Sequence, residues 1–231
     1  MTSVPVSKPP GRTSRIRVKR VAKRAVYDRE AIYAVLDAGF LCHVAYVIDG
    51  HPYVTPTNYW REGDHLYWHG SSASRMLRQL ATGVPVCVTV THLDGMVLAR
   101  SGFNHTMNYR SVMALGVCEA VEGPAKLASL EVFMERLYPG RWAEARPLTA
   151  KELKATTLLR MELNEFSAKI RNAPPPLDDV DKDVRCWSGI IPLALTPGKP
   201  VACESLVDEV PAYARDVAKR FQLSVRFPPK E

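Results

Sequence analysis

The most restrictive feature of the sequence is a run of strand-like segments separated by tight turns, FLCHVAYVIDGHPYVTPTNYWREGDHLYWHG, over residues 40–70. Asp49-Gly50 is a strong signal for a two-residue hairpin turn, and Glu62-Gly63-Asp64 marks a second turn. Alternate residues from Phe40 to Ile48 are apolar, which places them on one face of a strand. The run therefore predicts three consecutive antiparallel strands.

Similar patterns predict the elements elsewhere in the chain. Asp28 is a candidate cap for a short helix that Gly39 ends, and Thr149 with Glu152 forms a capping-box pattern. Gly116 is expected at a bulge or bend of its strand. Further helices are expected at 74–81, 124–137, after 149 and near 213–221. Further strands are expected at 84–90, at 96–103 after a turn at 93–95, and at 109–121, 158–170 and 185–195.

Six or seven strands, mostly in hairpins, with a few helices predict a mainly β fold, an antiparallel split β-barrel of Greek-key type with α-helical additions. The chain divides into a basic N-terminal arm (1–24), a barrel domain (25–195) and a C-terminal extension (196–231). No Rossmann glycine fingerprint and no Walker P-loop is present.

Composition and charge exclude several classes of function. Hydrophobic residues make up 46% of the chain, but no apolar run approaches the roughly 20 residues of a membrane span. The basic N-terminus has no apolar core and is therefore not a secretory signal. The five cysteines are scattered without metal-ligand spacing, so we expect free thiols, no metal site and a cytoplasmic protein.

The net charge of +7 comes largely from the basic arm, where eight Lys and Arg residues between 8 and 24 have no acidic neighbour. A short basic arm is typical of a solvated tail or a local anion contact. No interleaving of aromatic and basic residues accompanies it, so nucleic-acid binding is not expected.

The stretch YWHGSSASRMLRQL, residues 67–80, joins a predicted strand to a predicted helix through small hydroxyl residues and one arginine. Two interpretations are open. A serine simply caps the helix, or the corner binds a phosphate through Ser71, Ser74 and the guanidinium of Arg75. Gly70 would let the backbone approach such a ligand.

Other candidate ligand-binding residues each have a structural alternative. His69 is suited to proton transfer or to a hydrogen bond with a heterocycle, but a lone histidine is usually structural. Thr55, Thr57 and Asn58 would face a ligand or solvent. Ser111 would line a site or a barrel rim, and Trp187 would cover a flat ligand or pack a final strand.

In this order the segments HVAYVIDGHPYVTPTNYW, LYWHGSSASRMLRQL, VPVCVTVTHLDGMVLARS, MNYRSVMALGVCEAVE and GRWAEARPLTAKELKAT resemble the pyridoxamine 5′-phosphate oxidase-like FMN-binding split barrels. The resemblance covers roughly residues 25–195. It is closest to the flavin-nucleotide-binding group, which is similar to the nitroimidazole resistance proteins.

The resemblance implies a homodimer with FMN at the subunit interface and a small-molecule substrate. It implies that one strand lies along the flavin, that Ser74 and Arg75 hold its phosphate, and that His69 is the best candidate for a reactive role. The implied cofactor-binding residues are Val54, Thr55, Pro56, Thr57, Asn58, His69, Gly70, Ser71, Ser74, Arg75, Ser111 and Trp187.

The chain departs from the true oxidases at several positions. Tyr53 and Asn58 stand where their strand motif begins with Arg and ends with Lys, and Met76 replaces the lysine after the phosphate arginine. No match to their substrate-phosphate residues follows Trp187. The expected function is therefore an FMN-dependent oxidoreductase other than a vitamin B6 oxidase. The alternative is a non-catalytic module that binds flavin or haem, with His43, His69 or His105 as candidate axial ligands.

Overall fold

The computed structural model describes residues 13–203 and 209–217 of the chain. Residues 1–12 of the predicted basic arm and residues 218–221 of the predicted tail helix lie outside the described residues. None of the helices in the described residues is long and apolar enough to cross a membrane.

The described chain forms mainly antiparallel β structure with short helices around it, as the sequence predicts. The strands are β1 (Ala25–Val26), β2 (Leu41–Ile48), β3 (His51–Asn58), β4 (Trp60–Glu62), β5 (His65–Ser71), β6 (Pro85–Leu98), β7 (Thr106–Ala120), β8 (Thr156–Glu162), β9 (Glu165–Arg171) and β10 (Gly189–Pro192). The α-helices are α1 (Arg29–Asp37), α2 (Arg75–Leu80), α3 (Gly123–Leu137), α4 (Arg141–Glu144), α5 (Ala150–Ala155) and α6 (Ala212–Arg215). Single 3₁₀ turns are η1 (Ala22–Arg24), η2 (Gly102–Asn104) and η3 (Asp179–Asp181).

The strands follow the order β3-β2-β6-β7-β8-β5-β4, and the sheet does not close. β7 connects its two halves, because it pairs with β9 over residues 109–115 and with β8 over residues 118–120. Gly116 lies between these two pairings. A Cβ at Gly116 would come within 2.8 Å of Met161 Cγ, so only glycine lets β8 approach at this bend.

The barrel interior holds the larger of two hydrophobic clusters. Alternate residues of β2 are buried in it, together with one face of α1 and the apolar face of α2. The second cluster joins Trp60, Tyr67, Val121 and Leu158 and is covered by Phe133 of α3. The two clusters show that β5 is buried on both faces, since Leu66 and Trp68 belong to the first cluster.

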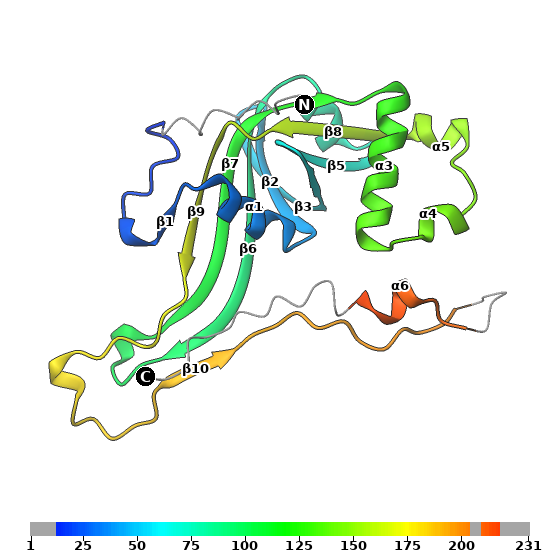
Figure 1. Cartoon of the computed structure of the whole chain (residues 1–231). Coiled ribbons are helices and arrows are strands. Elements are labelled where there is room, and N and C mark those ends of the chain that lie inside the picture. Colours follow the sequence, from blue (N-terminus) through cyan, green and yellow to red (C-terminus); the bar gives the residue numbers. More distant parts are fainter. Residues whose placement is uncertain (1–12, 204–208, 218–231) are drawn as a thin grey trace, which may run out of the picture.

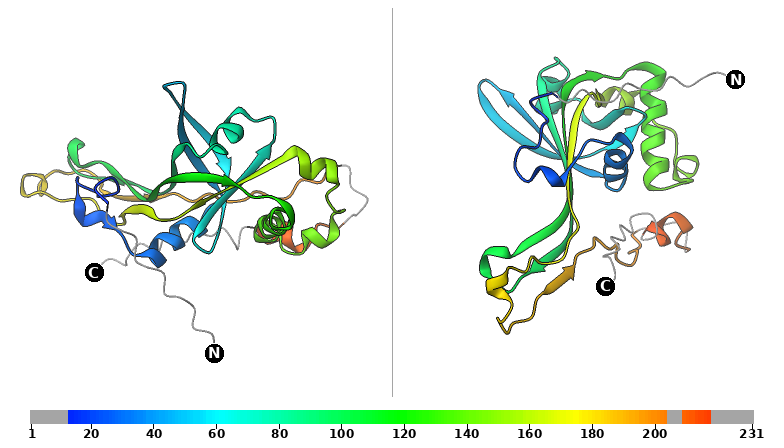
Figure 2. Two further views of the ribbon diagram at one scale, coloured as in Figure 1. Left: turned by 90° about the horizontal axis from the view of Figure 1, so that it is seen from above. Right: turned by 60° about the vertical axis from the view of Figure 1, so that its left-hand side comes forward.

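The long strands β6 and β7 curve away from the barrel as an arm, and β10 with the segment that follows runs beneath it (Figure 1). β10 pairs with residues 95–98 of β6, beyond the part of β6 that pairs with β2. The right-hand view of Figure 2 shows the β2–β3 hairpin projecting from the opposite side of the sheet to α3.

Three of the predicted helix starts are confirmed by their side-chain caps. The Asp28 side chain accepts a hydrogen bond from the Ala31 amide at the start of α1, and the Ser74 side chain accepts one from Leu77 at the start of α2. The capping box of Thr149 and Glu152 is present at α5. The hairpin turn at Asp49-Gly50 is confirmed too, and both residues have a positive φ as a type I′ turn requires.

Three predicted boundaries are wrong. Residues 40–70 form four strands, because the chain breaks pairing at Tyr59 between β3 and β4. Residues 158–170 form two strands that turn at Leu163-Asn164.

The predicted turn at residues 93–95 is also wrong, because β6 runs straight through it with only a shift in register between Leu93 and Gly95. The physical reason is Asp94, whose buried carboxylate accepts hydrogen bonds of 2.9 and 2.8 Å from Arg110 on the neighbouring strand. With this cross-strand pair in place, residues 93–95 form a bulge within β6 and not a chain-reversing turn.

Candidate functional site

β3 is an edge strand, and it carries five of the predicted ligand-binding residues on two different faces. Thr55 and Thr57 pair with Val44 and Cys42 of β2, so they point to the barrel side and are half-buried. The exposed residues Val54, Pro56 and Asn58 point to the outer side. The two threonines therefore share the barrel side of β3, and Asn58 lies on its opposite side.

Two tyrosines extend the barrel-side row of β3. Tyr53 and Tyr46 are register partners whose rings stack with centroids 5.7 Å apart. The Tyr46 hydroxyl lies 3.0 Å from Thr55 Oγ1. The sequence alone marked Tyr53 only as a departure from the oxidases, although its spacing of two from Thr55 already placed both residues on one face.

Arg75, the first residue of α2, reaches this row. Its guanidinium carbon lies 5.1 Å from the centre of the Tyr53 ring. Within the described residues Arg75 has no carboxylate partner and its side chain is exposed. An arginine held over a ring face keeps its N–H groups available, so the site has an unpaired cation at the Tyr53 end of the barrel-side row of β3.

The serines of the corner have local hydrogen bonds as well. Ser71 Oγ accepts a bond from the Ala73 amide, 3.2 Å, and Ser74 is the cap of α2. α2 has only six residues, so Arg75 and the serine hydroxyls, more than the helix dipole, would attract an anion. A Cβ at Gly70 would lie 3.0 Å from Leu77 Cδ1, so this glycine also permits close packing of α2.

His69 packs on the side of β5 that faces α3. Its ring centroid lies 4.9 Å from that of Phe133 and 5.8 Å from that of Trp60, both in edge contacts. Burial lowers the pKa of His69 below its ordinary value of 6.5, so the ring is neutral at pH 7. Its Nδ1 is buried without a hydrogen-bond partner among the described residues. The contacts of His69 and Arg75 do not bring these two side chains together.

Ser111 and Trp187 lie elsewhere in the chain. Ser111 is on the outer face of β7, where its hydroxyl donates to the Lys169 carbonyl at 3.2 Å. Trp187 belongs to the segment before β10 and is 65% exposed. A single copy of the chain therefore assembles the β3 and Arg75 parts of the predicted site but not these two residues.

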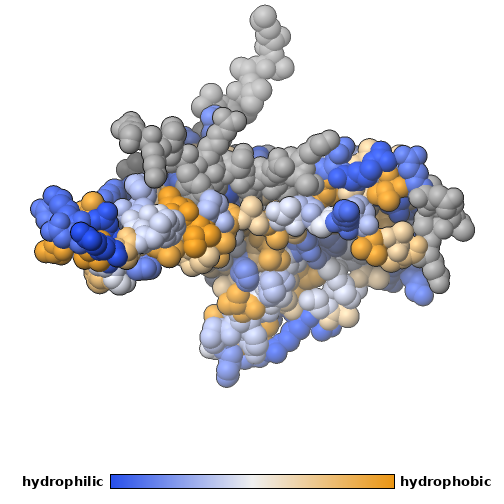
Figure 3. Space-filling model, turned by 90° about the horizontal axis from the view of Figure 1, so that it is seen from below, coloured by the Kyte–Doolittle hydropathy of each residue, from blue (hydrophilic) through white to orange (hydrophobic). Residues whose placement is uncertain are grey.

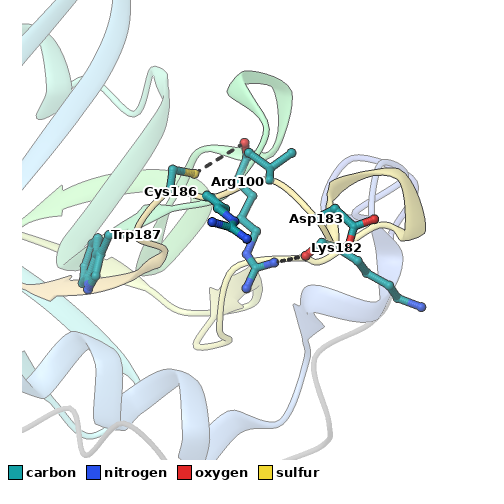
Figure 4. Close-up of a pocket in the computed structure, with 7 residues that line it drawn as sticks. Arg100, Lys182, Asp183, Cys186 and Trp187 are labelled. Carbon is teal, nitrogen blue, oxygen red and sulfur yellow. Dashed lines mark hydrogen bonds between the residues drawn. The ribbon is translucent and has the colours of Figure 1, made fainter.

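Trp187 lines a pocket of about 700 Å³ beside Arg100, just beyond the end of β6. Figure 4 shows Arg100 in the middle of this pocket, with Trp187 and Lys182 on opposite sides. The guanidinium of Arg100 donates to the Lys182 carbonyl, and Cys186 Sγ lies 3.8 Å from the Arg100 carbonyl. A Cβ at Gly189 would come within 2.7 Å of the Trp187 ring, so this glycine allows the ring to lie across the backbone.

The comparisons with known proteins agree with this architecture. Residues 28–170 match the sequence profile of a family described as pyridoxamine 5′-phosphate oxidase. The flavocytochrome Anf3 from Azotobacter vinelandii is 41% identical, with a TM-score of 0.82, over 90% of this chain and 96% of that one. The FAD and haem binding protein from Mycobacterium smegmatis is 37% identical, with a TM-score of 0.81, over 84% of this chain and 97% of that one.

A further likeness concerns the fold alone. A protein described as a 5-nitroimidazole antibiotic resistance protein, from Bacteroides thetaiotaomicron, is 21% identical, with a TM-score of 0.52, over 63% of this chain and 86% of that one. A search of the curated proteins found no match.

The two kinds of match cover different lengths of the chain. More than a third of the chain lies outside residues 28–170, whereas the flavocytochrome match leaves only a tenth of the chain uncovered. The segment after residue 170 is therefore shared, at least in large part, with that protein.

Proposed function

Because this chain belongs to the pyridoxamine 5′-phosphate oxidase family, we propose that it binds a flavin nucleotide and is an oxidoreductase that acts on a small molecule. The observation that carries the proposal is the unpaired guanidinium of Arg75, held over Tyr53 beside the threonines of β3. A family member with a free cation at this corner has a suitable partner for a flavin phosphate.

Different residues would bind different parts of the flavin nucleotide. Arg75 would bind the phosphate with support from the Ser71 and Ser74 hydroxyls, and Thr55 and Thr57 offer hydrogen bonds along β3. A bound flavin supplies the transfer of electrons or hydride, and the protein supplies orientation and electrostatics. His69 is neutral at pH 7, and the free Nδ1 of its ring is the candidate group for moving a proton.

The sequence predicts FMN, and we keep FMN as one form of the proposed cofactor. The relative from Mycobacterium smegmatis is described as an FAD-binding protein, so FAD is the other form. Both carry the phosphate that Arg75 would bind. Chromatography of the flavin released from the purified protein distinguishes them.

We also propose a homodimer with the flavin between subunits, because an apolar row crosses β3, β2, β6 and β7 on the outer face of the main sheet. Cross-strand register aligns Val54, Ala45, Cys87 and Leu115 in one row of this face. Val54 is 63% exposed although its neighbours are apolar. A second copy would cover this row and bring its own Ser111 or Trp187 toward the flavin. Sedimentation of the wild type against Ala45→Arg tests this interface.

The segment that follows β9, residues 172–203, gives a second reason to expect a partner copy. Figure 3 views the underside of the molecule, where this segment runs, and shows apolar side chains in orange at its surface. Val180, Trp187, Leu195 and Val201 are each more than half exposed. Exposed apolar residues in such number are typical of a surface that a partner covers.

Haem binding is the second candidate function, favoured by the flavocytochrome that matches the chain beyond residue 170. The described chain does not fit haem, because no histidine lines the pocket at Trp187 or a second pocket that residues 15–18 form with outer residues of β6, β7 and β9. His43 and His105 are exposed and His69 is packed among aromatic rings. A Soret band in the purified protein would support haem, and its absence would remove this candidate.

All five cysteines are free thiols, and Cys42 and Cys118 are buried. Burial raises the pKa of both thiols to about 12, so they are inert. Free thiols fit a reducing compartment, and on this ground we propose a cytoplasmic protein.

The oxidoreductase proposal is tested by anaerobic mixing of flavin-loaded protein with NADH or NADPH, followed at the flavin absorbance. Bleaching of the flavin, with recovery when an acceptor is added, supports an enzyme. Flavin that stays oxidised with every donor tested would favour a non-catalytic binding or sensing module.

A further inference from the structure

Part of the basic N-terminal segment is fixed against the outer face of the sheet. The side chain of Ile16 is 1% exposed, and the Val18 amide donates a hydrogen bond of 2.9 Å to the Tyr27 hydroxyl. Arg15 forms an ion pair with Glu165 of β9. Residues 15–18 are therefore a part of the fold, whereas the sequence left open a solvated tail or a local anion contact for the basic arm.

This segment roofs a pocket of about 430 Å³. The floor is formed mainly by outward-facing residues of β6, β7 and β9, the strands whose alternate residues fill the barrel core. Four of these residues carry hydroxyl groups: Thr89, Thr91, Ser111 and Ser167. Ser111 already donates its hydroxyl hydrogen to the Lys169 carbonyl, so the other three are the candidate donors to a ligand.

The charge of the pocket is positive. Its lining contains three cations and no carboxylate. Arg15 is neutralised by Glu165, whereas Arg17 and Lys169 have no ion-pair partner in the described part of the chain. Two unpaired cations above a floor of hydroxyls attract an anion with many hydrogen-bond acceptors.

The pocket is separate from the corner at Arg75. Arg75 contacts the barrel side of β3, whereas the pocket lies on the outer side of the sheet. Three strand intervals separate β3 from β7 in the strand order, which is about 14 Å. The volume also exceeds what a single inorganic phosphate needs, and it falls in the range of small-ligand pockets.

We propose that this pocket binds the diphosphate and ribose of a nucleoside diphosphate group, with Arg17 and Lys169 on the two phosphates and the hydroxyl floor on the sugar. That group has two sources in flavin chemistry. It is the second half of a flavin dinucleotide bound across the subunit interface, or it is half of a nicotinamide dinucleotide that delivers electrons.

The probe is ADP, titrated calorimetrically into the full-length protein with and without bound flavin. Arg17→Ala and Lys169→Ala should each weaken ADP binding about ten-fold or more, since each removes a charge-assisted contact. Lys169→Arg should retain part of the affinity. Arg20→Ala is the matched control, because Arg20 is an exposed cation of the same segment outside the pocket.

ADP binding to both flavin-loaded and flavin-free protein supports the site and assigns it to a nicotinamide dinucleotide. Binding to flavin-free protein alone, with FAD but not FMN affinity reduced in the two variants, supports the site and assigns it to a flavin dinucleotide. The proposal is overturned if ADP does not bind, if both variants bind like the wild type, or if FMN affinity falls as much as FAD affinity. A protein that binds no flavin at all would contradict the proposed function. The ADP titration would still test the pocket in that case, because ADP contains no flavin.

Discussion

The guanidinium of Arg75 lies over the ring of Tyr53, 5.1 Å from its centre, and this contact joins the start of α2 to the edge strand β3. Tyr53 is in turn stacked on Tyr46, whose hydroxyl contacts Thr55. The cation is thus oriented by an aromatic pair while its hydrogen-bond donors stay available. The first two predictions follow from this relationship.

Replacement of Arg75 by alanine should weaken flavin binding about ten-fold or more, because a charge-assisted contact to the phosphate is lost. The dissociation constant is measured by fluorescence quenching on reconstitution of the flavin-free protein. Arg78→Ala is the matched control, since Arg78 is an exposed arginine one turn further along α2. Equal affinity in wild type and Arg75→Ala would remove Arg75 from the site.

Replacement of Tyr53 by leucine should weaken flavin binding by a smaller amount, a few-fold, because a cation–π contact at an exposed site is worth about 0.5–1 kcal/mol. Tyr53→Phe keeps the ring face and should bind flavin like the wild type. The same reconstitution titration measures both variants. If phenylalanine proves as harmful as leucine, the hydroxyl of Tyr53 and not its ring supports the site.

The pair of Asp94 and Arg110 should matter for folding. The Asp94 side chain is only 5% exposed, and Asp94→Ala leaves the Arg110 charge without its partner. The free energy of unfolding in urea should fall by about 3 kcal/mol. Asp179→Ala is the control, because the exposed ion pair of Asp179 with Lys182 should contribute little. A small loss in Asp94→Ala would mean that solvent reaches the bulge.

His69 should make the protein less stable in mild acid. Burial lowers the pKa of His69 below 6.5 in the folded protein, so the unfolded chain takes up a proton at a higher pH than the folded chain. Its contribution to stability is complete above pH 6.5 and is lost as the pH falls below that value, by at most about 1.4 kcal/mol per pH unit.

The urea midpoints of wild type and His69→Gln between pH 7 and pH 5 measure this contribution. The variant should lose less stability on acidification, while His92, whose pKa burial also lowers, supplies the remaining slope in both proteins. Parallel pH profiles would show that the His69 ring is accessible to protons in the folded state. The same variant also tests the proposed reactive role of His69. If His69→Gln binds flavin normally but its flavin is reduced more slowly, His69 takes part in the reaction.

The sequence predicted the local features of the fold well. Alternation of apolar residues in β2 and the caps at Asp28, Ser74 and Thr149 depend on neighbours in the chain, and all are confirmed. The turn expected at residues 93–95 failed because Asp94 bonds to Arg110, sixteen residues away. The contact between Asp94 and Arg110 forms only when β6 and β7 are paired, so no local sequence pattern indicates it.

The candidate site was harder to predict for the same reason. Tyr53 was missed because its ring becomes part of the site only when α2 carries Arg75 over β3. Trp187 was expected near the flavin, but a single chain places it in a different pocket at the end of the arm. The anchoring of residues 15–18 depends on the burial of Ile16 against the sheet, which no local pattern indicated.

The most direct test of the account is the absorption spectrum of the purified full-length protein, followed by heat denaturation and chromatography of the released cofactor. We predict a yellow protein with flavin bands, which releases FMN or FAD in stoichiometric amount. A colourless protein that does not regain flavin absorbance after incubation with either nucleotide would contradict the proposed function.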